Sequence, residues 1–259
     1  MDLDLHERAF VVSGASSGIG LATAQRLVRE GARVCCFARD LDHLTAAFAD
    51  TVTPHDQLLL LAGDARRPED VDAIVESAVR TFGGVHGVVA NAGAGVTAGV
   101  DADSEVWREQ FTVKIGAAMA LVRAARPHLV DTQGAIVLVN GVSAHHPSPE
   151  LAPVGAARSA LANYAATLSA DLAPDGVRVV AVNVGVIETA RQRERYERSG
   201  ATTEYADWCR AEALRRSIPL QRMGRPDEVG DTIAFLLSDR SSYTTGTSID
   251  ISGGLDART

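Results

Sequence analysis

The sequence has too few cysteines for a disulfide-rich protein and no apolar run long enough to cross a membrane. Its 259 residues include three cysteines, Cys35, Cys36 and Cys209, which cannot form a disulfide framework. Cys35 and Cys36 stand in an apolar run, where we expect both to be buried. No run approaches the roughly 20 apolar residues of a membrane-spanning helix, so we expect no membrane partner.

Positive charge is also scarce. There are 25 Lys and Arg residues against 33 Asp and Glu residues, which gives a net charge of -8. This balance favours neither nucleic acid nor an anionic membrane as a partner. No metal-ligand spacing is present, so no metal is predicted. Residues 1–8 are acidic and lack the apolar core of a signal peptide, so a cytoplasmic location is expected.

Apolar runs and helix-period stretches alternate along the chain, as is typical of an α/β protein. Strand-like runs lie at 9–12, 33–37, 58–62, 85–90, 135–139, 177–182 and 247–251. The alternation predicts a Rossmann-like three-layer sandwich, with a parallel sheet of about seven strands and helices on both faces. No linker or repeat interrupts the pattern, so we expect a single domain over residues 1–259.

The first strand-to-helix turn, residues 13–20, has the sequence Ser-Gly-Ala-Ser-Ser-Gly-Ile-Gly. Gly14 lets the chain leave the strand, Gly18 lets backbone N–H groups approach a pyrophosphate, and Gly20 lets the helix pack close to the strand. The positive end of the following helix dipole favours the phosphates. The turn therefore predicts a dinucleotide site.

The residue at the end of the second strand bears on cofactor choice. A carboxylate there would bind a ribose 2′-hydroxyl, whereas the guanidinium of Arg39 suits a 2′-phosphate. We therefore expect NADP(H) rather than NAD(H). Asp40 follows directly, but one step along an extended chain it should point elsewhere. A solvated surface arginine is the alternative interpretation of Arg39.

The chain resembles the short-chain dehydrogenase/reductase family over essentially its full length. Besides the glycine turn, the likeness is carried by Asn91-Ala92-Gly93, Arg-Pro-Asp-Glu-Val at 225–229, Tyr-Thr-Thr-Gly at 243–246 and the glycine pair at 253–254. The resemblance implies pyrophosphate binding by the turn, adenine binding at Asp64, ribose binding near Asn91 and nicotinamide binding further on. The implied cofactor-binding residues are Gly14, Ser16, Ser17, Gly18, Ile19, Gly20, Arg39, Asp64, Ala65, Asn91, Ala92, Gly93, Arg158, Ile187 and Thr189.

The family's catalytic residues do not carry over. An ungapped comparison with its Tyr-x-x-x-Lys motif puts Val154 at the tyrosine position and Arg158 at the lysine position. The serine position is Gly141 and the asparagine position is Lys114. In the family the tyrosine protonates the substrate oxygen, and a positioned acid is typically worth about 10²- to 10⁴-fold in rate. Valine cannot take this role.

Four residues are candidate substitutes: Lys114, His145, His146 and Arg158. A desolvated lysine can have a pKa low enough to donate a proton, and histidine titrates near neutral pH. Arg158 is expected to bind cofactor or substrate, because a guanidinium does not release a proton near neutral pH. A lysine paired with an acid, or solvated histidines in a proline-rich loop, are the alternatives.

Three functions stay open on these residues. The protein is an oxidoreductase that reduces a carbonyl, imine or enone with a non-standard proton donor, or it uses the fold for non-redox biosynthetic chemistry. Otherwise it is an inactive subunit that only binds cofactor. Retention of the whole glycine turn argues for a bound nucleotide in each case.

Two further expectations concern the second half of the chain. In the family, the segment at about 190–222 covers the substrate, and Trp208 with Tyr205 could form an apolar wall there. Small residues are frequent at 114–125 and 159–172, which permits close helix packing across a two-fold axis. We expect a homodimer or homotetramer that acts on a small molecule.

Overall fold

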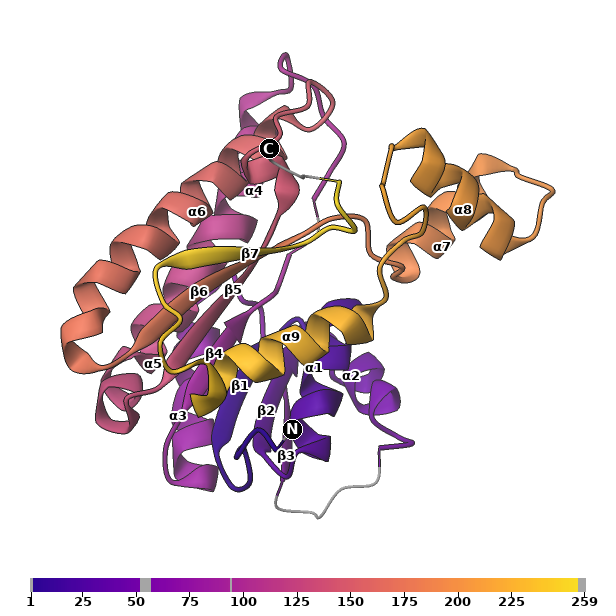
Figure 1. The fold of residues 1–259 in the computed structure, drawn as a ribbon. Coiled ribbons are helices and arrows are strands. Elements are labelled where there is room, and N and C mark those ends of the chain that lie inside the picture. The colour runs from indigo at the N-terminus through magenta and orange to yellow at the C-terminus, as the bar shows by residue number, and fades with distance from the viewer. Residues whose placement is uncertain (1, 52–56, 94, 256–259) are drawn as a thin grey trace.

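The computed structural model, which describes residues 2–51, 57–93 and 95–255, contains one parallel sheet of seven strands in the order β3-β2-β1-β4-β5-β6-β7 (Figure 1). This confirms the predicted fold. Each strand overlaps a predicted strand-like run. The central strands are apolar because a sheet covered on both faces needs apolar side chains on both, whereas the edge strand β7 is largely exposed. The strands are β1 (Ala9–Ser13), β2 (Arg33–Ala38), β3 (Leu58–Ala62), β4 (Gly87–Ala90), β5 (Ala135–Gly141), β6 (Arg178–Val184) and β7 (Thr247–Ile251).

Helices cover both faces of the sheet. One layer packs around Phe10 and Val12 of β1 and consists of α1 (Gly18–Arg29), α2 (Leu41–Ala47) and α9 (Pro226–Leu237). The other packs around Val11 of the same strand and consists of α3 (Pro68–Phe82), α5 (Ala117–Thr132) and α6 (Ala152–Leu172). The alternation along β1 therefore supplies both cores.

The adjacent cysteines of β2 follow the same alternation. Cys35 belongs to the core under α3 and α5, and Cys36 to the core under α1 and α9. Both are buried, as the sequence predicted, and burial raises the pKa of the Cys35 thiol to about 12. The two thiols are therefore inert packing groups.

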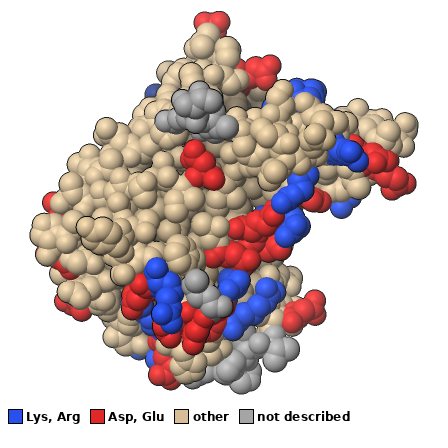
Figure 2. Space-filling view, viewed as in Figure 1, with Lys and Arg blue, Asp and Glu red and all other residues tan. Residues whose placement is uncertain are grey.

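Two features position a site at the carboxyl ends of the strands. The strand order reverses between β1 and β4, which is where ligands bind in open parallel sheets. Beyond this edge, α7 (Ala190–Ser199) and α8 (Tyr205–Arg215) project from the main body (Figure 1). Figure 2 shows charged side chains of both signs gathering from the region of α1, α2 and α9 toward α7 and α8, whereas the area over β7 and α6 carries few.

Among the described residues, none of the helices combines the length and the apolar character that a membrane span requires.

Candidate functional site

A cleft of about 770 Å³ runs along the carboxyl ends of the strands. It passes the point where β1 and β4 are neighbours and ends beneath the start of α7. Every residue that the sequence suggested for cofactor binding lines this cleft, except Gly20, which lies behind the turn. The structure therefore brings together side chains that are more than 170 residues apart in the sequence, from Gly14 to Thr189.

The glycine turn has no room for side chains at its critical positions. Gly14 and Gly18 have φ of +64° and +55°, a left-handed conformation that favours glycine. A Cβ on Gly20 would lie 2.3 Å from the carbonyl oxygen of Gly14 and 2.5 Å from Asn91 Nδ2. The backbone at the start of α1 therefore lines the cleft on one side and packs against Gly14 and Asn91 on the other.

Ser13 and Asn91 fix this turn to the end of β4. The backbone N–H groups of Asn91 and Ala92 donate to Ser13 Oγ at 2.9 and 3.0 Å. Asn91 Nδ2 donates in return to the carbonyl oxygens of Ser13 and Gly14, both at 3.1 Å. Asn91 therefore holds the turn through its side chain, while its backbone stays at the cleft. The role of Ser13 was not recognised from the sequence.

Arg39 and Asp40, at the far end of the cleft, differ in their contacts. Arg39 is exposed and has no carboxylate within ion-pair distance among the described residues. Asp40 caps α2, because its Oδ1 accepts from the backbone N–H of His43 at 2.9 Å. Asp40 therefore has a structural task of its own, which leaves Arg39 available for an anionic ligand.

Asp64 and Arg66 form an ion pair in the same region. Arg66 binds Asp64 through three contacts of 2.5 to 3.0 Å and also donates to Glu109 at 3.0 Å. The guanidinium lowers the pKa of Asp64. Arg66 was not predicted as a site residue, although it stands two positions after Asp64, a predicted cofactor residue.

Lys114 lies at the other end of the cleft, in a π-helical segment (Thr112–Gly116) between α4 (Ser104–Phe111) and α5. Such segments often occur at functional sites. Its Nζ donates to the carbonyl oxygen of Gly93 at 2.5 Å. Burial, together with the guanidinium groups of Arg158 and Arg191, lowers the pKa of Lys114 to about 7. Lys114 is also the only lysine in the chain, a signal that the sequence held and that we missed.

Arg158 occupies space that a side chain at position 141 would need. Its Nη1 donates to Ser143 Oγ at 2.9 Å, and a Cβ on Gly141 would lie 2.5 Å from its Cζ. Burial and the neighbouring Arg191 lower the pKa of Arg158 to about 10. Gly141 and Arg158 are therefore sterically matched. Ser143, in the short 3-10 turn after β5, is buried and holds Arg158 without lining the cleft itself.

Val154, one helical turn before Arg158, does not reach the cleft. It is buried, and its methyl groups lie 3.2 and 3.3 Å from where a Cβ on Gly95 would be. The loop that contains Gly95 is tied to the start of α6 by two backbone hydrogen bonds, Ala98 N–H to Glu150 O and Ala152 N–H to Ala98 O. Position 154 is therefore covered by this loop rather than open to a ligand.

The structure does not bring His145 to the cleft. His145 and His146 follow a short 3-10 turn (Val142–Ala144), are exposed, and are absent from the residues that line the cavity. Of the candidate substitutes, Lys114 and Arg158 share the site, whereas the two histidines lie outside it.

Arg191 is the clearest addition to the predicted site. It lines the cleft at the start of α7, and it lowers the pKa of both Lys114 and Arg158. In the sequence it stands two residues after Thr189, a predicted cofactor residue, but it is one of many arginines in the segment 190–222 and was not predicted as a site residue.

The aromatic residues of the projecting segment pack on one another instead of lining the cleft. Tyr205 and Trp208 have ring centroids 6.1 Å apart, Tyr196 lies edge-on to both, and the guanidinium of Arg193 sits 3.6 Å from the Tyr205 ring centre. None of them is among the residues that line the cavity. They form a small core between α7 and α8, so the expected substrate wall is not seen.

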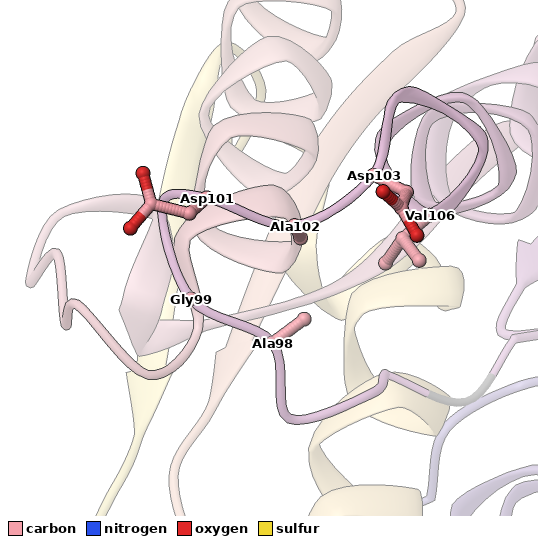
Figure 3. Close-up of a pocket in the computed structure, with 6 residues that line it drawn as sticks. All are labelled: Ala98, Gly99, Asp101, Ala102, Asp103 and Val106. Carbon is pink, nitrogen blue, oxygen red and sulfur yellow. The ribbon is translucent and has the colours of Figure 1, made fainter.

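A second, smaller hollow of about 430 Å³ lies near the start of α4 (Figure 3). It is lined by Ala98, Gly99, Asp101, Ala102, Asp103 and Val106, with the two aspartates at opposite ends. Within the described ranges, no group of three or more His, Cys, Asp or Glu side chains is arranged to hold a metal ion. The cleft, with its convergent polar groups, is therefore the candidate active site.

The match between Gly141 and Arg158 makes a testable prediction. A Gly141→Ser substitution should displace the guanidinium from Ser143 and lower the free energy of unfolding by about 1–3 kcal/mol, the usual cost of overpacking. Denaturant unfolding measures this effect. The same change on an Arg158→Ala background should cost much less, because the colliding group is gone. Equal costs on both backgrounds would show that the two positions are independent.

Comparison with known proteins gives full-length matches. The family described as enoyl-(acyl carrier protein) reductase matches residues 14–256. The chain is 29% identical to dehydrogenase/reductase SDR family member 4 of Sus scrofa, over 98% of this chain and 89% of that protein.

Two solved structures resemble it closely. One is the NADPH-bound short chain oxidoreductase of Pseudomonas aeruginosa PAO1, which contains an atypical catalytic center, with 36% identity, a TM-score of 0.93 and 99% of each chain covered. The other is L-sorbose reductase of Gluconobacter frateurii, complexed with NADPH and L-sorbose, with 28% identity, a TM-score of 0.93 and both chains fully covered.

Proposed function

Because the chain belongs to the short-chain dehydrogenase/reductase family, we propose that it is an NADP(H)-dependent reductase of a small molecule, with Lys114 as its proton donor. The group reduced is a carbonyl, an imine or an enone. The observation that carries the proposal is the position of Lys114, whose ammonium lies in the cleft with a pKa of about 7.

The cleft fits a dinucleotide on steric grounds. Gly14, Gly18 and Gly20 allow the turn its tight course, because a Cβ at these positions would press on Ala92, Thr189 and the Gly14 carbonyl, respectively. The helix N-terminus that follows the turn favours phosphate. Arg39 would hold the 2′-phosphate. Asp64 and Ala65 would lie at the adenine, Asn91 to Gly93 along the ribose, and Ile187 and Thr189 at the nicotinamide. The NADPH-bound Pseudomonas and Gluconobacter neighbours support this assignment.

The catalytic positions support an atypical centre. Val154, at the position of the family's tyrosine, is buried beneath the Gly95 loop and has no proton to give. Gly141 and Arg158 stand at the positions of the family's serine and lysine, and the arginine side chain fits only because position 141 is a glycine. The structural neighbour from Pseudomonas is itself described as having an atypical catalytic center. We propose that the same holds for this chain.

Lys114 would act as the acid in reduction. The cofactor, when bound, supplies a hydride to the substrate carbon. Lys114 Nζ would donate a proton to the substrate atom that gains negative charge, and would be reprotonated from water, so that one hydride and one proton are added in total. A lysine with a pKa near the working pH is suited to this transfer. Arg158 would orient the substrate through its fixed guanidinium.

Titration with NADPH and NADH, followed by the quenching of intrinsic fluorescence, tests the cofactor assignment. An Arg39→Gln variant should bind NADPH about 10- to 100-fold more weakly, the value of one charge-assisted contact, with its NADH affinity unchanged. Arg80→Gln, which removes an exposed arginine of α3, is the control. Tighter binding of NADH than of NADPH by the wild-type protein would overturn the assignment.

The titration, combined with turnover assays, separates the two alternative functions. Tight NADPH binding without turnover on any carbonyl, imine or enone compound would favour an inactive cofactor-binding subunit. Turnover without a change in nicotinamide absorbance would favour non-redox chemistry. The proposed reductase requires both cofactor binding and oxidation of NADPH by substrate.

We also propose self-association as a homodimer or homotetramer. Met119 of α5 is exposed despite its apolar side chain, and Tyr243, just before β7, is fully exposed. The area over β7 and α6 carries few charges (Figure 2). Light scattering coupled to size-exclusion chromatography measures the number of copies. A cytoplasmic location stays a prediction.

A further inference from the structure

Three cationic side chains converge at the nicotinamide end of the cleft. Lys114 comes from the π-helical segment, Arg158 from α6 and Arg191 from the start of α7, and all three line the cavity. Within the described part of the chain, no carboxylate lies within ion-pair distance of any of them. Arg66, at the other end of the same cleft, contrasts with them because it is neutralised by Asp64 and Glu109.

The carboxylates of the cleft are engaged elsewhere. Asp64 and Glu109 bind Arg66, and Asp40 caps α2. Glu194 of α7 pairs with Arg198 at 3.5 Å. None of the four carboxylates that line the cavity therefore compensates the three cations, and an excess of positive charge is left where the substrate would bind.

This excess is costly to the folded protein. After burial, the neighbouring guanidinium groups are the cause of the lowered pKa of Lys114, and Arg191 does the same to Arg158. Like charges held together without a partner are expected to bind an anion, which relieves both the repulsion and the loss of solvation.

Arg158 also has unused hydrogen-bonding capacity. Its Nη1 donates to Ser143, but its Nε is buried and has no partner. A buried donor left unpaired is unusual and marks a position where a further acceptor is expected. The guanidinium can lie there only because position 141 has no Cβ. Arg158 can therefore donate at least one more hydrogen bond than it makes in this structure.

We infer that the substrate of the proposed reductase is an anion, with a carboxylate or phosphate group held between Arg158 and Arg191 beside the reacting centre. This inference rests on the proposed function, because it assigns the substrate class of the same cleft. Guanidinium groups suit both oxyanions, since their planar N–H groups match two oxygens at once. Lys114, within the same group of cations, then stays close to the atom that is protonated.

The single lysine allows a direct test that needs no turnover. Protein labelled with ¹³C at the lysine ε-carbon gives one such side-chain resonance, from Lys114. With NADPH at saturation, so that the cofactor phosphate sites are filled, malonate, inorganic phosphate and the neutral analogue malonamide are each titrated. Malonate or phosphate should shift the Lys114 resonance in a saturable manner, and malonamide should not. The comparison between malonate and phosphate shows which oxyanion is preferred.

Variants assign the binding to these arginines. Arg158→Gln and Arg191→Gln should each weaken binding of the preferred anion about 10- to 100-fold, the value of a charge-assisted hydrogen bond. Arg210→Gln removes the same charge from an exposed position on α8 outside the cleft and should leave the affinity unchanged. Arg191 is exposed at a helix end, so its variant is expected to fold even if Arg158→Gln does not.

Equal shifts with malonate and malonamide, no saturable shift with either anion, or unchanged affinity in the Arg191→Gln variant would each overturn the inference. These results are distinguishable from failure of the proposed function. Cofactor binding is measured separately, and a protein that binds NADPH but no anion contradicts only the substrate class.

Discussion

A Lys114→Met variant should reduce its substrate about 10²- to 10⁴-fold more slowly than the wild-type protein, because it lacks the proposed proton donor. Methionine keeps most of the length and apolar character of lysine but cannot donate to Gly93 O, the hydrogen bond seen at 2.5 Å. NADPH affinity should change little, because the phosphate cradle lies at the other end of the cleft. Oxidation of NADPH is followed with a compound found by screening carbonyls, imines and enones.

The proposed role of Lys114 also predicts how the activity depends on pH. Only the protonated ammonium can donate, and the pKa of Lys114 in the free protein is about 7, so kcat/KM for reduction should fall as the pH rises through about 7. The single labelled lysine resonance should titrate over the same range in the free protein. Without Lys114 the profile should lose this step.

His145→Ala is the informative comparison. His145 is exposed outside the cleft, so this variant should retain the wild-type rate. A large loss in His145→Ala together with full activity in Lys114→Met would identify the histidine as the donor. Full activity in both variants would show that neither residue gives the proton.

The second large effect is expected at the glycine turn. A Gly20→Ala variant should bind NADPH about 5- to 150-fold more weakly, because an overpacking cost of about 1–3 kcal/mol would fall on the backbone of the glycine turn. The added Cβ would stand 2.3 Å from Gly14 O, and the only relief is to move the turn that forms the phosphate cradle. Fluorescence titration and thermal unfolding measure affinity and stability.

Gly84→Ala is the matched control for this prediction. Position 84 has an ordinary backbone conformation, and its nearest neighbour would be a Thr132 methyl group at 3.9 Å, so the same methyl group fits. The control should keep both affinity and stability. Wild-type affinity in Gly20→Ala would mean that the turn does not form the phosphate site.

The fold was predictable because its signal is local. Most strands are short apolar runs bounded by turns, and a parallel sheet covered on both faces produces such runs directly. The edge strand β7, Thr-Ser-Ile-Asp-Ile, is the exception. The cysteine pair of β2 shows how far this holds: both residues were expected to be buried, and the structure places them in opposite cores. The cofactor end of the cleft followed from the residues that come after each strand.

The end of the cleft that holds Lys114 and Arg158 was harder to predict from the sequence, because it depends on contacts between different helices and strands. That Arg158 reaches Ser143 and needs glycine at 141 depends on how α6 packs across β5, which no periodicity reveals. The π-helical turn that carries Lys114 looks like ordinary helix in the sequence. Arg191 was hidden among similar residues, and Tyr205 with Trp208, expected at the substrate, pack within the projecting segment instead.

The interlocked packing at positions 95, 141, 154 and 158 has an evolutionary consequence. A tyrosine introduced at 154 alone would meet the Gly95 loop, and a serine introduced at 141 alone would meet the Arg158 guanidinium. Neither substitution alone would be accommodated without a change at the position it packs against. Related chains with this arrangement should therefore vary in pairs, position 95 with 154 and position 141 with 158.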